Sequence, residues 1–326
     1  MSTVGGLFSG IGGIETGFEK AGFKILWSNE NDPYSVRSFQ HNYKHKLYPD
    51  NIRKLNFKKI KPVDVLVGGF PCQAFSVAGY RKGFRDPRGN LFFEICRAIT
   101  ELPKMPKAIM LENVKNIRGH DNGKTARVIT KSLRELGYSV FWNLFNTSIH
   151  TDIPQNRERV WIYAYKGILP LTFKLSPNTK KLKVNFKDLL DKHPDQSLFK
   201  NQKQIKRLKE LYNLDFMVKE PSCADLYNKN IRKDGISITI LEPHHNKMRV
   251  VHPPKNKQLK VRKYSVSEHF RFMGFKNEKI DLCNQSYQQL CKMLANGWDI
   301  NLVALIYENI FNQLENSKTK QISLAS

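Results

Sequence analysis

The sequence predicts an α/β fold, in which helices cross over between the strands of a parallel sheet, together with a second, smaller domain. The chain has 326 residues, which corresponds to about two domains of roughly 150 residues, and 40% of its residues are hydrophobic, enough for a sizeable core. In the first half, short apolar runs alternate with helix-forming stretches, which is the pattern of a parallel sheet with crossover helices.

The expected strands are short runs rich in Val, Ile, Leu and aromatic residues, typical of strands buried on both faces. They are Lys24–Ser28, Val63–Gly68, Lys107–Leu111, Tyr138–Phe145 and Val160–Tyr165. The expected helices are Gly13–Ala21, Pro33–Asn42, Leu91–Leu102, Gly123–Leu136, Ser265–Met273, Ser286–Ala295 and Asn301–Leu314. Asp32 followed by Pro33 is a favourable helix start. Ligands of such sheets bind at the carboxyl ends of the strands, so the functional residues are expected there.

The charge of the chain points to a polyanionic partner, nucleic acid before membrane. Lys and Arg number 54 and Asp and Glu 29, which gives a formal net charge of +25. Residues 166–263 contain 23 of the basic and 9 of the acidic residues, so more than half of the surplus lies in this segment. We expect the segment to form the second domain; the alternative is a solvated, lysine-rich surface with no target.

Several protein classes are disfavoured by features that the sequence lacks. No apolar run approaches the roughly 18 residues of a membrane span, and the N-terminus lacks the basic and apolar regions of a signal peptide. The five cysteines, at positions 72, 96, 223, 283 and 291, form no CxxC pair, so neither a disulfide framework nor a metal site is indicated. We therefore expect a soluble, cytoplasmic protein without a bound metal.

The opening run Leu7–Ile14, LFSGIGGI, reads as a strand end, a glycine turn and a helix start. Glycines there allow a ligand to approach the backbone closely. A dinucleotide fingerprint, GxGxxG, would require glycine where Glu15 stands. Glu30, twenty residues after Gly10, can accept hydrogen bonds from ribose hydroxyls. These features suit a nucleoside cofactor such as S-adenosylmethionine; a glycine turn that only packs a helix on the sheet is the alternative.

Two further strand ends carry candidate reactive groups. Cys72 lies in the run GFPCQ after the expected strand Val63–Gly68, where a thiol raised by Gly and Pro is placed for nucleophilic attack. The alternative is a buried packing cysteine. Glu112, in the run LENV, is an acid or base candidate, with a helix-capping or ion-paired glutamate as the alternative.

Two basic segments accompany these strand ends. The loop Ala78–Asn90 has three glycines and four basic residues, as a lid over nucleic acid would. Gln155, Arg157 and Arg159 alternate along a strand and are expected to share one face, where two guanidinium groups can hold a carboxylate, a phosphate or a base edge. A solvated charge run is the alternative, although the following Val-Trp-Ile-Tyr indicates a buried strand.

Taken in order, FSGIGG, Glu30, GFPCQ, ENV, QNRER, Arg262–Phe275 and the segment around Asn296 resemble the motifs of the bacterial DNA (cytosine-5) methyltransferases, especially the small GCGC-methylating type. The resemblance implies a Rossmann-like, S-adenosylmethionine-dependent methyltransferase sheet with a smaller target-recognition domain. Residues 1–172 and 286–326 would form the large catalytic and cofactor-binding domain, and residues 173–285 the small one. Double-stranded DNA would be the substrate, bound by a monomer.

The resemblance also implies a role for each matching residue. Cys72 would attack C6 of a flipped-out cytosine, and Glu112 would hydrogen-bond or protonate its N3. Arg157 would help to hold Glu112 and the ring, Arg159 would face the oxygen side of the base, and the Ser76–Asn90 loop would close over it. The substrate contacts would further include Gln73, Ser76 and Gln155. The cofactor contacts would be Phe8, Gly10, Ile11, Gly12, Gly13, Ile14, Glu30, Asn31, Asn51, Ile52, Gly69, Pro71, Leu91 and Asn296.

The chain departs from the family pattern at two places. Asn51 stands where the family has Asp, and Ala295-Asn296-Gly297-Trp298 replaces Gly-Asn-Ser-Val, so weaker cofactor binding is expected. The run Arg262–Phe275 is expected to pack and orient the small domain. Two alternatives remain. One is a tRNA methyltransferase of the same family, although Cys223-Ala-Asp does not match that branch's Cys-Phe-Thr. The other is an inactive DNA-binding homologue. A separate restriction endonuclease is a possible partner.

Overall fold

The computed structural model describes residues 1–70, 91–241, 248–275, 280–281 and 283–325, except for the side chains of 315–325. Its contacts divide the chain into two compact units. Unit 1 consists of Met1–Phe145, Glu158–Asn178 and Ile300–Ser326, and unit 2 of Asn146–Arg157 and Thr179–Asp299. These bounds differ from the expected 172/173 and 285/286. Residues 146–157 and 286–299, expected in the large domain, lie in unit 2, and residues 173–178, expected in the small domain, lie in unit 1. The roles expected of the two domains stay predictions.

Unit 1 is built on a seven-stranded sheet of order β3-β2-β1-β4-β5-β8-β6. Its strands are β1 (Thr3–Leu7), β2 (Lys24–Asn29), β3 (Lys46–Tyr48), β4 (Val65–Gly68), β5 (Ala108–Val114), β6 (Ser139–Asn146) and β8 (Glu158–Tyr165). The pairs from β3 to β5 are parallel, as predicted, but β8 runs antiparallel to β5. The predicted parallel sheet is therefore mostly parallel, with β8 as an antiparallel strand. The segment before β8 contains only the four-residue α6 (Thr147–His150), too short for a crossover helix.

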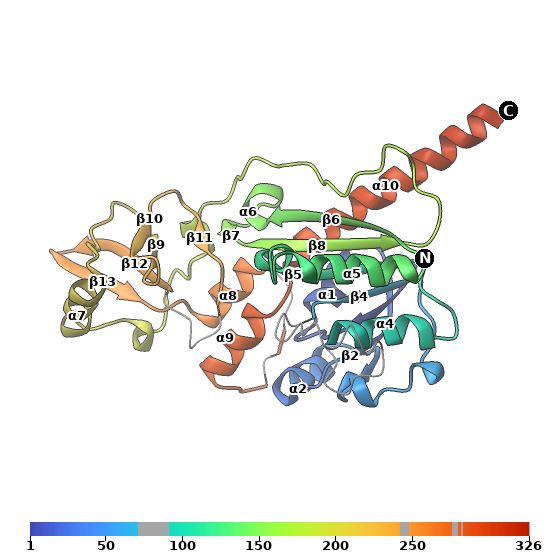
Figure 1. Ribbon diagram of the computed structural model, residues 1–326. Coiled ribbons are helices and arrows are strands. Elements are labelled where there is room, and N and C mark those ends of the chain that lie inside the picture. The colour runs from blue at the N-terminus through green and yellow to red at the C-terminus, as the bar shows by residue number, and fades with distance from the viewer. Residues whose placement is uncertain (71–90, 242–247, 276–279, 282, 326) are drawn as a thin grey trace. The chain divides into compact units, whose positions relative to one another are not determined.

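Helices cover this sheet, and their positions follow the sequence closely. They are α1 (Gly13–Lys20), α2 (Pro33–Asn42), α4 (Leu91–Glu101), α5 (Lys124–Glu135) and α10 (Ile300–Ala325), with 3-10 turns η1 (Ile52–Lys54), η2 (Phe57–Lys59) and η4 (Lys115–Arg118). Asp32 caps α2 by accepting bonds from the N–H groups of Tyr34 and Ser35. In Figure 1, α4 and α5 lie side by side on one face, whereas α1 packs on α10. That packing is close, because a Cβ on Gly17 would lie 2.7 Å from Val303.

Unit 2 contains a four-stranded antiparallel sheet of order β10-β9-β12-β13 and the short parallel pair β11-β7. Its strands are β7 (Gln155–Asn156), β9 (Ser222–Asp225), β10 (Asn230–Arg232), β11 (Ser237–Ile238), β12 (Met248–Lys255) and β13 (Gln258–Arg262). Its helices besides α6 are α7 (Gln202–Tyr212), α8 (Val266–Phe272) and α9 (Tyr287–Ala295), with turns η5 (Phe186–Leu189) and η6 (Gln196–Leu198). Phe216 and Val251 are fully buried in its small core.

The run Arg262–Phe275 packs inside unit 2. The guanidinium of Arg262 donates to both carboxylate oxygens of Glu268, at 2.8 and 2.6 Å, and both side chains are fully buried. Glu268 also closes a capping box with Ser265 at the start of α8. Such a pair is costly to break, because removal of one partner leaves an uncompensated buried charge.

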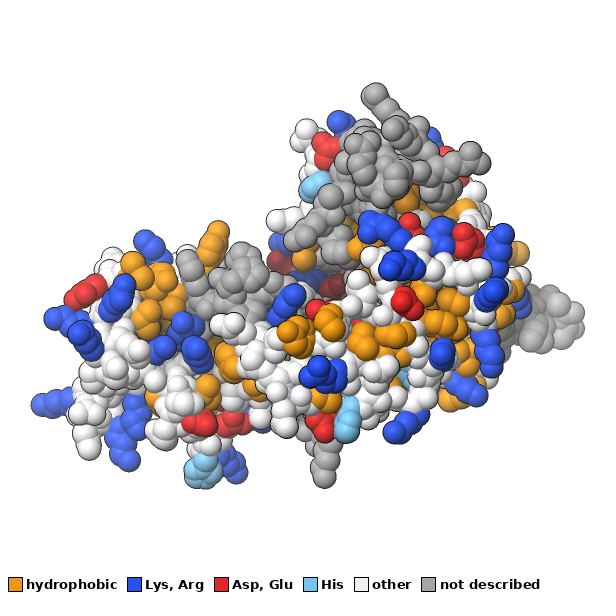
Figure 2. Space-filling view, turned by 90° about the horizontal axis from the view of Figure 1, so that it is seen from below, with side chains coloured by type: hydrophobic (Ala, Val, Ile, Leu, Met, Phe, Trp, Pro, Cys, Tyr) orange, Lys and Arg blue, Asp and Glu red, His pale blue; other side chains and the backbone are white. Residues whose placement is uncertain are grey.

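Basic side chains dominate the charged surface. Lys and Arg are spread over the face shown in Figure 2, and Asp and Glu are sparse between them. Among the described residues, no helix combines the length and apolar character that crossing a membrane would need.

Candidate active site

The turn between β1 and α1 brings backbone to the carboxyl edge of the sheet. Phe8, Gly10 and Gly12 all have positive φ angles, of 57°, 57° and 93°. A Cβ on Gly10 would meet no atom within 4 Å, whereas a Cβ on Gly12 would overlap the ring of Tyr43. Gly10 therefore leaves space for a ligand against the backbone, and Gly12 serves the packing of the turn.

The remaining predicted cofactor contacts of this turn are core residues. The side chains of Ile11 and Ile14 are 0% and 2% exposed, and Gly13 is buried at the start of α1. Only their backbone could face a ligand. Glu15, which stands where a dinucleotide fingerprint has glycine, is fully buried and accepts a 2.5 Å hydrogen bond from Ser28 Oγ. Burial raises the pKa of the Glu15 carboxyl to about 7.

Glu30 joins the end of β2 to the glycine turn. One carboxylate oxygen accepts the N–H of Gly10 at 2.7 Å, and the other accepts those of Asn31 and Asp32, each at 2.8 Å. Glu30 is 9% exposed. A carboxylate offers about four acceptor positions, so three occupied positions leave one for a further donor. This is the position in which an acid can accept a ribose hydroxyl.

Asn51 and Ile52 follow β3, beside the end of β2. The Asn51 side chain caps η1 by accepting the N–H of Arg53 at 3.1 Å, and Ile52 is buried. Asn29 fastens this region, because its amide donates to the carbonyls of Tyr48 and Asp50. Asn29 is not among the predicted site residues, although its place next to Glu30 at a strand end is a signal for it.

The end of β4 is tied to the end of β5 by a buried hydrogen bond. Asn113 Nδ2 donates to the carbonyl of Phe70 at 2.8 Å, just after Gly69. Pro71, Cys72, Gln73 and Ser76 follow in the sequence but lie outside the described residues, as does the rest of the 71–90 segment. Leu91, half-buried, begins α4. Asn113 belongs to the ENV motif, but the predicted site residues include only its neighbour Glu112.

Glu112 forms an ion pair with Arg159 across the β5–β8 pair. Arg159 Nε lies 3.0 Å from Glu112 Oε1, and the two side chains are 15% and 11% exposed. Burial lowers the pKa of Arg159, and the Glu112 carboxylate opposes that shift. The resemblance implies that Arg157 contacts Glu112. The structure shows an ion pair between Arg159 and Glu112. The guanidinium of Arg159 fixes the orientation of the Glu112 carboxylate. A carboxylate that hydrogen-bonds a substrate atom needs such a fixed orientation.

Gln155, Arg157 and Arg159 do not share one strand face, contrary to the prediction. The N–H of Arg157 donates to the carbonyl of Gln155 at 2.9 Å, a tight turn that separates β7 from β8 and interrupts the alternation. Gln155 and Arg157 are buried in unit 2, whereas Arg159 belongs to unit 1.

Within unit 2, Gln155 and Arg157 hold the 146–157 segment in place. Gln155 Nε2 donates to the carbonyl of Phe272 at 2.6 Å, and Arg157 donates to the carbonyl of Gly297 at 2.7 Å. Asn296, the C-cap of α9, lies beside that second contact. The four-residue departure Ala295–Trp298 therefore includes a carbonyl that anchors Arg157.

Comparisons with known proteins agree with this arrangement. The family model described as C-5 cytosine-specific DNA methylase matches residues 2–312. The type II methyltransferase M.Bsp6I of Bacillus sp. (strain RFL6) is 33% identical over 332 residues, which cover 96% of this chain and 100% of that protein. M.HhaI of Haemophilus parahaemolyticus is 40% identical over 184 residues, covering 56% of this chain and 55% of M.HhaI.

A solved structure extends the likeness to the fold. A DNMT2 mutant of Spodoptera frugiperda superimposes with a TM-score of 0.75 at 18% identity, covering 95% of this chain and 100% of that one. The predicted α/β fold with a mostly parallel methyltransferase sheet is thus confirmed. Because the family model spans nearly the whole sequence, the chain belongs to the C-5 cytosine-specific DNA methylase family, the DNA (cytosine-5-)-methyltransferases.

Proposed function

We propose that this protein transfers a methyl group from S-adenosylmethionine to C5 of a specific cytosine in duplex DNA. The observation that carries the proposal is the largely buried Arg159–Glu112 pair toward the carboxyl end of β5, next to Asn113 and its bond to Phe70. The pair presents an oriented carboxylate one strand away from the segment in which Cys72 follows β4.

The residues of the glycine turn fit the proposed cofactor. Gly10 faces open space, and Glu30 keeps one acceptor position for a ribose hydroxyl. Asn51, the departure from Asp, offers an amide oxygen that already accepts the N–H of Arg53. When bound, S-adenosylmethionine would supply an electrophilic methyl group. We infer that Phe8, Gly10, Glu30 and Ile52 carry most of its binding, with Asn51 contributing less than an aspartate would.

The cytosine chemistry is assigned to Cys72 and Glu112. The Cys72 thiolate would add to C6, and the electron pair of the C5–C6 double bond would move toward C5, which becomes nucleophilic. Glu112 would hydrogen-bond or protonate N3, which makes C6 more electrophilic. After C5 has gained the methyl group, loss of its proton and departure of the thiolate would restore the double bond. Arg159 would hold Glu112, and Arg157 would help to hold the cytosine ring.

Access to C6 requires the cytosine to leave the stack, since its ring faces are covered in a duplex. Gln73 and Ser76 are proposed to contact the flipped base or its strand. Gln155 is fully buried, and its amide bonds to the Phe272 carbonyl and the Ile240 N–H, so its role is to support the 146–157 segment rather than to touch the base. The basic residues of 166–263 would bind phosphates, so affinity for DNA should fall steeply as salt rises. A salt-independent affinity would show that this segment is not the DNA surface.

The test uses S-adenosylmethionine with a labelled methyl group, unmethylated duplex DNA and, in parallel, tRNA. Label in DNA that is lost in Cys72→Ala and kept in Cys96→Ala supports the proposal; Cys96 is a fully buried cysteine of α4 and serves as the matched control. Bisulfite sequencing then reports the target. Activity retained in Cys72→Ala would refute the covalent mechanism. Label in tRNA alone would favour the RNA substrate, and no cofactor binding would favour an inactive DNA-binding homologue.

The covalent step has its own readout. Once the target is known, a duplex with 5-fluorocytosine at that position should form a stable adduct with wild-type protein, because C5 then has no proton to lose. Mass spectrometry of the peptide around Cys72 would locate the bond. The names of the relatives also support a type II restriction-modification setting. We further propose that the methyltransferase is a cytoplasmic monomer and that an endonuclease acts separately from it.

A further inference from the structure

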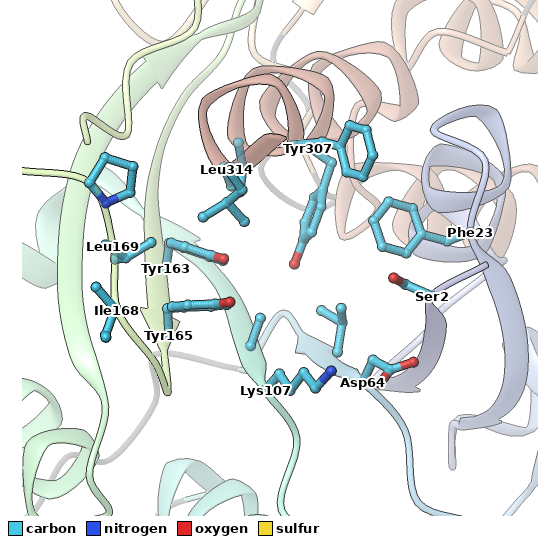
Figure 3. A pocket seen from close by; sticks show the side chains of 15 residues that line it. Ser2, Phe23, Asp64, Lys107, Tyr163, Tyr165, Ile168, Leu169, Tyr307 and Leu314 are labelled. Atoms are coloured by element: carbon cyan, nitrogen blue, oxygen red, sulfur yellow. The ribbon is translucent and has the colours of Figure 1, made fainter. Parts of the chain in front are cut away.

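Unit 1 has a cavity at the edge of the sheet opposite to Gly10, Glu30 and Glu112. Its volume is about 410 Å³, within the range of small-molecule sites. It is lined by the amino ends of β4 and β5, the carboxyl end of the antiparallel β8, and one side of α10 (Figure 3). Because the glycine turn and Glu112 stand at the other ends of the same strands, this cavity is separate from the proposed cofactor site.

A buried hydroxyl in this cavity lacks a hydrogen-bond partner. Tyr307 is 4% exposed, and among the described residues no atom bonds to its hydroxyl. Its ring is fixed by Phe18 and Phe23, with centroids at 4.4 and 5.1 Å. Figure 3 shows the Tyr307 oxygen pointing into the cavity. A hydroxyl buried without a partner is costly, so the cavity favours an occupant that bonds to it.

Two further hydroxyls and one ammonium group face the same space. Tyr163 and Tyr165 lie on one face of β8, their rings stacked with centroids 6.1 Å apart, and their hydroxyls point toward the cavity in Figure 3. Lys107, the residue before β5, also lines the cavity, and its positive charge helps to lower the pKa of the Asp64 carboxyl. Asp64 lies nearby, but its carboxylate oxygen Oδ2 already accepts the N–H and the hydroxyl of Thr3, at 3.0 and 2.8 Å.

The rim of the cavity is apolar and exposed. Ile168 is 90% exposed and Phe311 is 56% exposed, although both line the cavity. Exposed large apolar side chains around a hollow with a few converging polar groups are typical of ligand sites. Flat aromatic walls favour a flat apolar ligand, since ring contacts add to the area that is buried.

We propose that this cavity binds a small aromatic anion. Its ring system lies between β8 and α10, an acceptor atom bonds to the Tyr307 hydroxyl, and its anionic group is near the Lys107 ammonium. The ligand binds without displacing the methyl donor, because the two sites are at opposite ends of β1, β4 and β5.

The test measures fluorescence of 1-anilinonaphthalene-8-sulfonate, an aromatic anion, titrated into the full chain with saturating S-adenosylhomocysteine, which blocks the proposed cofactor site. Saturable binding is expected, about three- to ten-fold weaker in Tyr307→Phe, the effect of one lost hydrogen bond. Lys107→Gln should weaken binding further. Tyr138→Phe is the matched control: the buried Tyr138 hydroxyl donates to the carbonyl of Pro106 at 2.7 Å, so this variant should lose thermal stability and keep the probe.

Three results would overturn the proposal. One is the absence of saturable binding. Another is equal binding in wild type and both cavity variants, with a raised melting temperature in Tyr307→Phe, which would mean that the hydroxyl bonds only to water. The third is saturable binding in a parallel titration without S-adenosylhomocysteine that disappears when S-adenosylhomocysteine is present, which would place the probe in the cofactor site. A protein that fails to bind S-adenosylhomocysteine would count against the proposed function, while the comparison of variants would still report on the cavity.

Discussion

Arg159 and Glu112 form a largely buried ion pair diagonally across two antiparallel strands, with 3.0 Å between Arg159 Nε and Glu112 Oε1. The register pairs Glu112 with Trp161, so Arg159, two residues along β8, lies on the same face as Glu112. The antiparallel direction of β8 in the sheet brings Arg159 next to Glu112. The orientation of the proposed acid thus depends on the one strand that departs from the parallel arrangement.

Removal of the Glu112 carboxylate should abolish most of the activity. Glu112→Gln keeps the shape but cannot protonate N3, so kcat should fall about 100-fold or more. Arg159→Lys keeps the charge but loses the rigid planar fork, and a smaller fall of about ten-fold is expected. Methyl transfer to duplex DNA measures both. Glu158→Gln is the control, because its exposed pair with Lys115 should contribute little. Full activity in Glu112→Gln would contradict the assignment.

Glu30 should control cofactor affinity. Glu30→Gln leaves one side-chain oxygen for three backbone N–H groups and places an amide donor against them, so the glycine turn loses its shape. The Kd for S-adenosylhomocysteine should rise at least about ten-fold, the effect of roughly 1.4 kcal/mol. Calorimetric titration checks this. An unchanged Kd, with Glu135→Gln as an exposed control, would remove Glu30 from the cofactor site.

Asn113 is a positioning residue for the segment that carries Cys72. Asn113→Ala removes the bond to the Phe70 carbonyl, so kcat should fall while KM for DNA changes little. Asn143→Ala is a matched control, because Asn143 Nδ2 also donates to a backbone carbonyl, that of Leu175, at 2.5 Å in the same unit. Thermal unfolding should show a similar loss of stability in Asn113→Ala and Asn143→Ala. Steady-state kinetics should show a loss of kcat in Asn113→Ala alone. Equal kcat in the two variants would make Asn113 merely structural.

Glu15 should make the stability of the protein depend on pH. Its folded pKa of about 7 lies above the ordinary value of 4.5, so its contribution is fully present below pH 4.5 and is lost as pH rises through 7. The shift corresponds to about 3 kcal/mol. Glu15→Gln should be more stable than wild type at pH 8 and should lack this decline in urea unfolding between pH 5 and 8. A decline that persists in Glu15→Gln would assign it to another group.

Much of the large unit could be predicted because its signals are local. Apolar runs of four to eight residues between turn signals are typical of buried strands. The helix α2 begins at Pro33 after its Asp32 cap, as predicted. β3 escaped prediction because it has three residues, one of them an exposed lysine. The strands of unit 2 escaped it because, in this basic segment, the alternation that marks half-buried strands is weak.

In the candidate site, too, some residues could be predicted from the sequence, whereas their partners could not. The order of motifs is enough to name Glu30 and Glu112, since Glu30 directly follows β2 and Glu112 is the first polar residue of the apolar strand β5. The partners of these groups depend on distant segments: Gly10 for Glu30, Phe70 for Asn113 and Arg159 for Glu112. Strand direction and register set those pairings, and neither can be read from one strand alone. The sequence by itself therefore determines which chemical groups lie at or near the end of each strand. The contacts between strands are determined only in the tertiary structure, because hydrophobic burial sets the register in which the strands pair.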